Sequence, residues 1–246
     1  MSRGHSIAVC ALAILMSRAA YCAHPMLSED AGTQGAGNAE IEFGHSWTRE
    51  DGDLSRLFQP QFSYGYAQTV DLILQPSWLA NTSASGGHGF GDTNLDAKWR
   101  FHTAAPWSWA VRAGLELVTA EHGQGLPYGK VSPHAAWIAT IEASPFILDM
   151  NLGYAFVPDS PRLRSDLYHV SGAAIWAVHD RLSLTLDIAL DSDPDPAKNR
   201  PPATLLAGVI YTVVPGLDVD AGYLTGLNSP ASAKQWLFGV TYRWTP

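Results

Sequence analysis

The feature that most constrains the fold is a strict two-residue alternation of apolar and polar side chains. In residues 181–191, which read RLSLTLDIALD, five apolar side chains alternate with polar ones such as Ser183, Thr185 and Asp187. This period predicts a strand with one apolar and one polar face, because a helix would repeat its apolar positions three and four residues apart. In a soluble sandwich the leucines would meet a core, whereas in a membrane barrel they would meet lipid and the aspartates would face the lumen.

Twelve such segments can be counted, and the connections between them alternate between short and long. The predicted strands are residues 41–47, 57–67, 69–78, 93–102, 107–118, 130–143, 146–156, 167–178, 181–191, 203–213, 216–226 and 234–244. The long connections are residues 48–55, 80–92, 120–130, 157–165, 192–202 and 227–233. A sandwich has no reason to sort its loops in this way, whereas outer-membrane barrels combine short periplasmic turns, longer extracellular loops and an even strand number. We therefore predict an all-β fold, a transmembrane antiparallel β-barrel of about twelve strands in the outer membrane of a Gram-negative bacterium.

Aromatic residues also favour a membrane barrel over a sandwich core. Tryptophan and tyrosine prefer the interface between lipid and water. Seven tryptophans lie at or near the ends of predicted strands, namely Trp47, Trp78, Trp107, Trp109, Trp176, Trp236 and Trp244. We therefore expect the leucines of residues 181–191 to face lipid.

The first 23 residues have the character of an export signal. A basic start, an apolar run of ten residues and then small residues are typical of a cleaved signal peptide. Both cysteines, Cys10 and Cys22, lie in this leader, so we expect no disulfide in the mature chain. No later apolar run reaches about eighteen residues, which argues against helical membrane spans.

Three parts of the chain follow from these signals. We expect a cleaved signal peptide at residues 1–23, a periplasmic or lumen-plug segment at residues 24–37 and the outer-membrane barrel at residues 38–246. Residues 24–37 are rich in glycine and precede the first predicted strand, so they could lie in the lumen as a plug. Twelve strands should leave a narrow or partly occluded lumen, because eight strands are filled by side chains and sixteen or more leave an open channel.

The predicted mature chain is acidic. The leader holds two of the 15 Lys and Arg residues and none of the 23 Asp and Glu residues, which leaves 13 basic against 23 acidic residues and a net charge of −10. This balance argues against nucleic acid as a partner. The expected partners are outer-membrane lipid, a small-molecule solute and, during biogenesis, the barrel-assembly machinery.

The inward faces of the predicted strands carry the candidate site residues. The set expected to line the lumen is Lys98, Arg100, Arg112, Glu116, Glu142, Asp149, Asp187, Asp218 and Asp220. Its basic members lie on neighbouring strands, so they should form a basic wall opposite an acidic one, a field that orients dipolar solutes and gives a slight cation preference. An interior ion-pair network that only stabilises the barrel is the alternative. Lys98 and Arg112 carry like charges and should need Asp96 or Glu116 beside them.

The two ends of the predicted barrel should also meet through charges. The last strand must pair antiparallel with the first to close the sheet. Arg243 lies near the end of the chain, and Glu40 and Glu42 lie near the start of the first strand. We therefore predict that Arg243 contacts Glu40 or Glu42 across the seam.

A family resemblance covers nearly the whole predicted mature chain. Its most specific pieces are His24-Pro25, the stretch EDAGTQGAG at residues 29–37 and GDTNLDAKWRF at residues 91–101. These resemble the Gram-negative outer-membrane proteins named for the meta-pathway of phenol degradation. The resemblance implies a porin-like barrel that admits hydrophobic or aromatic small molecules, and it implies no catalytic residue.

Three function classes follow from these residues. The favoured one is an outer-membrane channel or transporter for small polar, amphipathic or aromatic solutes, without enzyme activity, cofactor or metal. A structural or adhesive barrel without transport is the alternative. An outer-membrane hydrolase is the third class, and it would need a Ser–His pair near the lipid boundary, for which His45 is the candidate histidine.

Overall fold

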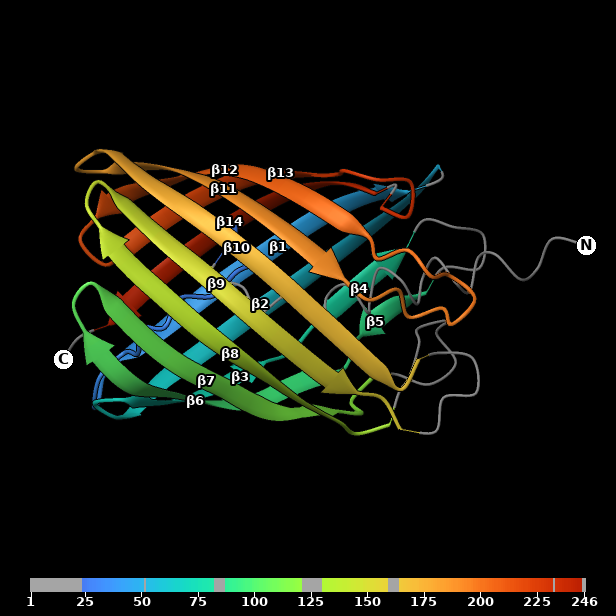
Figure 1. Cartoon of the computed structure of the whole chain (residues 1–246), viewed down its shortest axis with the longest axis horizontal. Coiled ribbons are helices and arrows are strands. Elements are labelled where there is room, and N and C mark those ends of the chain that lie inside the picture. The colour runs from blue at the N-terminus through green and yellow to red at the C-terminus, as the bar shows by residue number, and fades with distance from the viewer. Residues whose placement is uncertain are drawn as a thin grey trace, which may run out of the picture.

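The chain forms one closed barrel of antiparallel strands (Figure 1). The computed structural model describes residues 24–50, 52–81, 87–120, 130–158, 164–231 and 233–244, and the predicted signal peptide lies outside them. The strands are β1 (Ala39–Glu50), β2 (Asp53–Ala67), β3 (Val70–Gln75), β4 (Trp78–Asn81), β5 (His88–Phe90), β6 (Thr93–Ala104), β7 (Trp107–Leu117), β8 (Ser132–Ala143), β9 (Phe146–Phe156), β10 (Asp166–His179), β11 (Leu182–Asp191), β12 (Ala203–Val214), β13 (Leu217–Gly226) and β14 (Lys234–Trp244). Within the described residues, no helix is long and apolar enough to cross a membrane.

The fourteen strands correspond to the twelve predicted barrel strands, here called staves, because two of the staves are interrupted and each is divided into two strands. β2 pairs with β3 through its second half and with β4 through its first half, while β3 pairs with β6 and β4 with β5. The third stave breaks at Pro76, which cannot donate a hydrogen bond to the ladder. The fourth breaks beside it at Gly91 and Asp92, where the Gly91 amide donates to the Ser77 carbonyl and the Ser77 hydroxyl to the Asp92 carbonyl, both over 2.9 Å.

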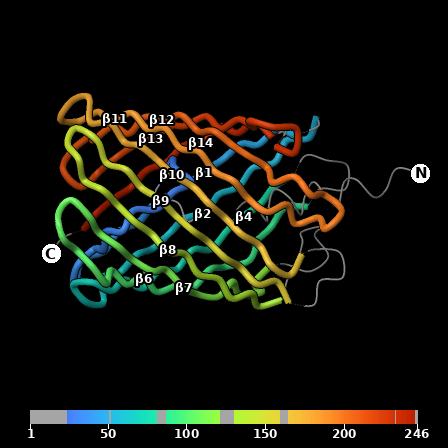
Figure 2. The backbone as a smooth tube through the Cα atoms, viewed as in Figure 1, coloured from blue at the N-terminus to red at the C-terminus, as the bar shows by residue number. Residues whose placement is uncertain are grey.

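Closure is complete on both sides of β1. Ala39 is the register partner of Trp244 on β14, and Glu50 is the partner of Asp53 on β2. Within the described residues, every stave therefore has hydrogen-bonded neighbours on both sides, although the short strand β5 itself pairs with β4 alone. The start of β1 and the end of β14 lie at the end of the barrel that carries the short turns, as Figure 2 shows at the left.

One predicted connection is wrong. Residues 48–55 were expected to form a long loop, but β1 runs to Glu50 and β2 begins at Asp53, so the two strands extend past most of that range. The polar composition of this stretch suggested a loop, yet a strand that reaches beyond the lipid can carry polar side chains on both faces. Residues 192–202, a long connection that the structure describes throughout, lie at the end of the barrel opposite the short turns, as do the strand ends that flank the other long connections.

The direction of the two faces agrees with a membrane barrel. On β11, Leu186 and Ile188 are exposed, while Thr185, Asp187 and Ala189 between and beside them are buried. The seven tryptophans that were predicted to lie near strand ends are all exposed on the outer surface. Trp47 and Trp236 are register partners toward the loop end, and Trp244 lies at the turn end. The apolar outer band and aromatic ends place the barrel in an outer membrane, with its polar residues turned inward.

Candidate functional site in the barrel interior

Residues 24–38, here called the N-terminal segment, lie inside the barrel and follow its inner wall. The wall partners of this segment, in their order around the barrel, are Asp220, Asp187, Ser171, Asn151, Thr140, Arg112, Lys98, Asp71 and Gly65. The segment meets them in this order except at one point, where the Glu29 side chain reaches ahead to Arg112 and Lys98 and Ala31 then contacts Thr140. These partners belong to β13, β11, β10, β9, β8, β7, β6, β3 and β2, which is the order of the strands around the barrel. The segment thus makes one circuit of the lumen before β1 begins.

The first half of the segment is held by its backbone. The amides of Leu27 and Ser28 both donate to Asp187 Oδ2 over 2.7 Å, and the Ser28 hydroxyl donates to Ser171 Oγ over 2.8 Å. The amide of Glu29 donates to Asn151 Oδ1 over 2.7 Å, and Asn151 Nδ2 donates back to the Glu29 carbonyl over 2.8 Å. Wall side chains therefore replace the ladder hydrogen bonds that a strand would provide.

The wall leaves room for the segment by carrying glycine where the segment comes nearest. A Cβ atom at Gly65 would overlap the Gly35 carbonyl, and one at Gly44 would overlap the His24 ring. At Gly208 a Cβ atom would lie 2.8 Å from Pro25 Cγ, closer than carbon atoms normally approach. The interior is therefore shaped for the segment over the strands on both sides of the seam.

A buried charged cluster lies where the segment crosses β6 and β7. Lys98 and Arg112 are register partners on these strands, and the Glu29 carboxylate lies between them. Glu29 Oε1 is 2.9 Å from Lys98 Nζ, and Glu29 Oε2 is 2.9 Å from Arg112 Nη1. Arg112 has no exposed surface, and only 6% of Lys98 is exposed.

Two wall residues orient the Arg112 guanidinium. Asp96 Oδ2 accepts hydrogen bonds from Arg112 Nε over 2.9 Å and from Arg112 Nη2 over 2.6 Å. His134 Nε2 lies 2.6 Å from the other Asp96 oxygen. The expected acid beside the Lys98–Arg112 pair is present as Asp96, and it leaves Nη1 directed at Glu29.

The remaining acids of the predicted set lie at several places on the inner wall. Asp149 and Asp187 are buried, Asp149 accepting from the Thr140 hydroxyl over 2.6 Å and Asp187 from the segment. Asp220 is also buried, with Oδ1 3.2 Å from His24 Nδ1. Each of these acids contacts the segment or the wall, although Asp149 Oδ2 is buried without a hydrogen-bond partner among the described residues.

The other predicted lining residues lie toward the two ends of the barrel. Both Arg100 and Glu142 lie at the turn end. Arg100 is half-buried, with Nη2 donating to the Gln68 carbonyl over 3.2 Å, whereas Glu142, which was predicted to line the lumen, is exposed. Glu116 is buried on β7 toward the loop end. These three do not join the Glu29 cluster.

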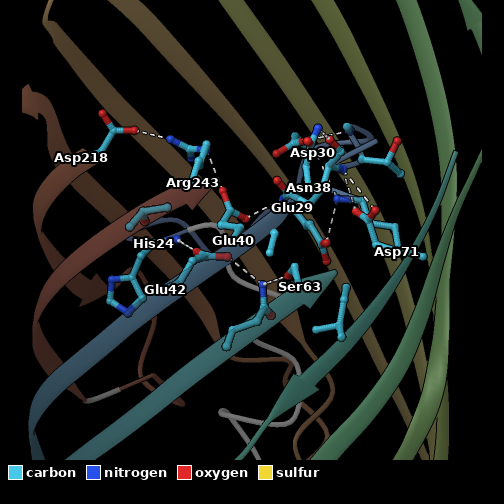
Figure 3. A pocket seen from close by; sticks show the side chains of 18 of the residues that line it. His24, Glu29, Asp30, Asn38, Glu40, Glu42, Ser63, Asp71, Asp218 and Arg243 are labelled. Atoms are coloured by element: carbon cyan, nitrogen blue, oxygen red, sulfur yellow. Dashed lines mark hydrogen bonds and ion pairs between the residues drawn. The ribbon is translucent and has the colours of Figure 1, made fainter. Parts of the chain in front are cut away.

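Two of the three predicted seam residues, Arg243 and Glu40, meet in a charged group that also includes Asp218. Arg243 Nε lies 2.7 Å from Glu40 Oε2, and Arg243 Nη1 donates to Asp218 Oδ2 over 2.5 Å. Glu42 is deeper in the barrel, where its carboxylate accepts from Gln61 Nε2 over 2.7 Å and from the His24 amide over 3.3 Å. Figure 3 shows Arg243 between Asp218 and Glu40.

A cavity of about 430 Å³ lies between the segment and the turn end of the barrel. Its acidic lining residues are Glu29, Asp30, Glu40, Glu42, Asp71, Asp218 and Asp220, and its cationic ones are Lys98 and Arg243. Met26, Ile73, Ile175 and Ile210 add apolar surface. The volume falls in the range of small-molecule sites, about 300–1,000 Å³. Acids outnumber cations, so the cavity attracts cations on balance.

His45 lies on the outer face among aromatic side chains. Its register partners are Phe58 on β2 and Phe238 on β14, and its ring lies 5.6 Å from that of Trp47 in an edge-on arrangement. No serine is opposite His45 on either neighbouring strand, so this position does not form the Ser–His pair that a hydrolase would need. Among the described residues, no group of three or more His, Cys, Asp or Glu side chains could hold a metal ion.

The residues that sequence reasoning missed are those of the segment itself. Glu29 and Gln34 were not expected to bind the wall, although Gln34 donates from its amide to Asp71 and from Nε2 to Glu40 over 2.8 Å. The signal that could have found them is the density of polar and glycine residues before the first strand, which does not alternate and so cannot be a stave.

Comparisons with known proteins place the chain beside outer-membrane channels. A family model described as "Putative MetA-pathway of phenol degradation" matches residues 25–244. An outer membrane channel from Pseudomonas putida F1 is similar over 87% of this chain and 98% of its own, with 11% identity and a TM-score of 0.66. The KdgM porin is similar over 84% and 99%, with 10% identity and a TM-score of 0.61, and the NanC porin over 82% and 98%, with 7% identity and a TM-score of 0.60. No curated protein matches the chain.

Proposed function

The chain belongs to the family described as "Putative MetA-pathway of phenol degradation". From this premise we propose that it is an outer-membrane channel for small polar, amphipathic or aromatic solutes. The N-terminal segment acts as an internal plug in this proposal. The chain has no catalytic role in it, and its partners are membrane lipid and the solute.

The observation that carries the proposal is the way in which the lumen is filled. A barrel that served only as a scaffold could fill its interior with wall side chains. Here the wall carries glycines and polar groups, and a separate stretch of chain occupies the space between them. Its contacts are hydrogen bonds and ion pairs, which water or a solute can replace.

The cavity on the turn side supports passage once the segment moves. It is already large enough for a small molecule and reaches the end of the barrel where Arg243 and Trp244 lie. Its charged and apolar lining suits a solute with one polar and one apolar part. Displacement of the segment would join this cavity to the loop side of the lumen.

A reversible lock on the segment tests the proposal. Ser28 Oγ and Ser171 Oγ are 2.8 Å apart, so cysteines at both positions lie close enough for a disulfide bond of about 2.05 Å. We expect the oxidised Ser28→Cys, Ser171→Cys protein to lose most of its solute flux in liposome-swelling and planar-bilayer assays, and reduction to restore it. The Ser171→Cys single variant, oxidised in the same way, is the matched control and should conduct in both states.

Two outcomes would contradict the proposal in different ways. Equal flux in the oxidised and reduced double variant would mean that solutes pass without movement of the segment. An absence of flux in the wild-type and reduced proteins would favour the structural or adhesive barrel instead.

A further inference from the structure

We infer that Lys98 and Arg112 form a binding site for the carboxylate of a monocarboxylic acid, and that Glu29 of the N-terminal segment occupies this site as an internal substitute for that ligand. The inference deepens the proposed channel function, on which its transport consequence rests, by naming the solute class. The binding site itself can be tested without transport.

The geometry is that of a carboxylate held by two donors. Each oxygen of Glu29 has its own cation, Lys98 Nζ at 2.9 Å for Oε1 and Arg112 Nη1 at 2.9 Å for Oε2. Hydrogen bonds between charged partners at this distance are among the stronger ones in proteins. All three side chains are buried, which reduces screening by water and salt.

The wall part of the site is arranged independently of Glu29. Lys98 and Arg112 face each other on neighbouring strands, where like charges repel. Asp96 holds two nitrogens of the guanidinium and His134 holds Asp96, so Nη1 is left for the Glu29 carboxylate, with Gln61 Oε1 as a longer wall acceptor at 3.3 Å. Two cations fixed toward one point require an anion there, because breaking a buried ion pair leaves an uncompensated charge.

The anion comes from the segment rather than from the wall. Glu29 belongs to a stretch that enters the ladder only at β1, and its backbone is held by Asn151 on β9, two strands along the wall from β7. A movement of the segment would therefore withdraw the carboxylate and leave the two cations in place. A solute that carries a carboxylate could then take the position that Glu29 held.

The surroundings restrict the ligand to a single negative charge. Lys98 and Glu29 line the cavity together with Met26 and Ile73, which offer apolar contact to the remainder of the solute. Asp30 and Asp71 line the same cavity, and Asp71 is the register partner of Lys98. A second negative charge on the solute would meet these acids, so monocarboxylates should bind and dicarboxylates should not.

Chemical rescue tests the site directly. Glu29→Ala removes the carboxylate and leaves a space that acetate can enter, while acetamide has the same shape without the charge. We expect acetate at about one hundred times its dissociation constant to raise the folded-to-unfolded ratio of refolded Glu29→Ala protein about a hundredfold, and acetamide to leave it unchanged. If the variant does not fold alone, its refolding yield in acetate against acetamide gives the same comparison.

Two further variants serve as controls. Gln34→Ala leaves a similar space in the same segment, but beside Glu40 and Asp71, so acetate should not stabilise it. Glu29→Ala combined with Lys98→Met removes one of the two cations and should lose the acetate effect. Equal rescue by acetate and acetamide, or rescue that survives Lys98→Met, would overturn the inference.

The solute class is tested on the otherwise wild-type chain. A cysteine at Ser28, which is fully buried, reports release of the segment through its rate of labelling by a maleimide. We expect benzoate to raise this rate several-fold and benzyl alcohol or phthalate to leave it unchanged. Acetate rescue without any benzoate effect would overturn the solute class and keep the carboxylate site. Loss of flux in every form of the protein would overturn the channel and leave the rescue result intact.

Discussion

The wall of the barrel and the N-terminal segment inside it are held by different kinds of contact. The wall is a continuous ladder, in which β1 alone has eleven register partners on β14 and twelve on β2. The segment makes two backbone hydrogen bonds with Gly65 at its end and otherwise depends on individual side chains such as Asp187, Asn151 and Arg112. Backbone pairing distributes stability over many bonds, so loss of a wall side chain that does not touch the segment should change little, whereas each wall side chain that anchors the segment should carry a large share.

This difference separates the part that must persist from the part that can move. Local opening concentrates in regions with few buried apolar contacts. The segment has two small apolar contact regions, and its other contacts are mostly polar. Leu27 packs against Leu206, Leu224 and Leu237, and Ala31 packs against Ala110, Ala136 and Ile138. A channel whose wall is rigid and whose obstruction is weakly held can open without unfolding.

The largest expected effect follows from removal of the central anchor. Arg112→Met leaves Glu29 and Asp96 buried without their guanidinium partner, which should cost about 3–5 kcal/mol, because an uncompensated buried charge is costly. We expect faster maleimide labelling of a Ser28→Cys reporter and a lower urea midpoint. Arg100→Met at the turn end is the control and should change both by much less. A small effect at Arg112 would mean that the cluster does not hold the segment.

A smaller effect on the segment is expected from a substitution that displaces it by steric overlap alone, without removing a charged group. Gly65→Ala places a Cβ atom against the Gly35 carbonyl, and overpacking of this kind costs about 1–3 kcal/mol. Because the segment is held less firmly than the wall, it should move, so reporter labelling and conductance should rise while the urea midpoint stays close to wild type. Gly172→Ala is the matched control, since its Cβ atom would lie at an ordinary 3.6 Å from the nearest atom. Loss of the folded barrel in Gly65→Ala but not in Gly172→Ala would contradict the comparison.

The wall was largely predictable from the sequence because its signal is local. Residues 181–191 alternate, and β11 covers Leu182–Asp191 with its leucines outward. The breaks in the third and fourth staves were not predicted, although Pro76 marks one of them, because the alternation continues across the break. The loop at residues 48–55 was wrong because the reach of a strand beyond the lipid depends on its neighbours and not on its own polarity.

The site was predictable only in part because its contacts join distant parts of the chain. Alternation placed Lys98, Arg112 and Asp187 on the inner face, where the structure has them. Alternation carries no information on which group fills the lumen between them, so Glu29 and its contact with Arg112, 83 residues away, were not foreseen. Composition indicated that residues 24–37 could enter the lumen, but pairing an irregular segment with a wall requires the closed barrel.

Ion selectivity should respond modestly to the cavity acids. Asp218 and Asp220 line the cavity on β13 and contribute to its excess of negative charge. We expect the wild-type channel to prefer cations slightly, and Asp218→Asn with Asp220→Asn to move the reversal potential in a KCl gradient toward zero. Asp187 anchors the segment but does not line the cavity. Asp187→Asn is therefore the control that separates a loosened segment from a loss of cavity charge. Anion preference in the wild type, or no shift in the double variant, would mean that these acids do not line the conduction path.

The smallest effect is expected at the seam, where the ion pairs of Arg243 add to backbone pairing between β1 and β14 that is already complete. Arg243 contacts both Glu40 and Asp218, but 46% of its side chain is exposed, and exposed ion pairs contribute about 0–1 kcal/mol. A double-mutant cycle of Arg243→Met and Glu40→Gln, measured by urea unfolding in lipid vesicles, should therefore give a coupling energy below about 1 kcal/mol. The backbone pairs between β1 and β14 remain in every variant and keep the barrel closed. A coupling energy well above this value would mean that the seam depends on side-chain charges in the way that the N-terminal segment does. The contrast between wall and segment would then not hold for the pairing of β1 with β14.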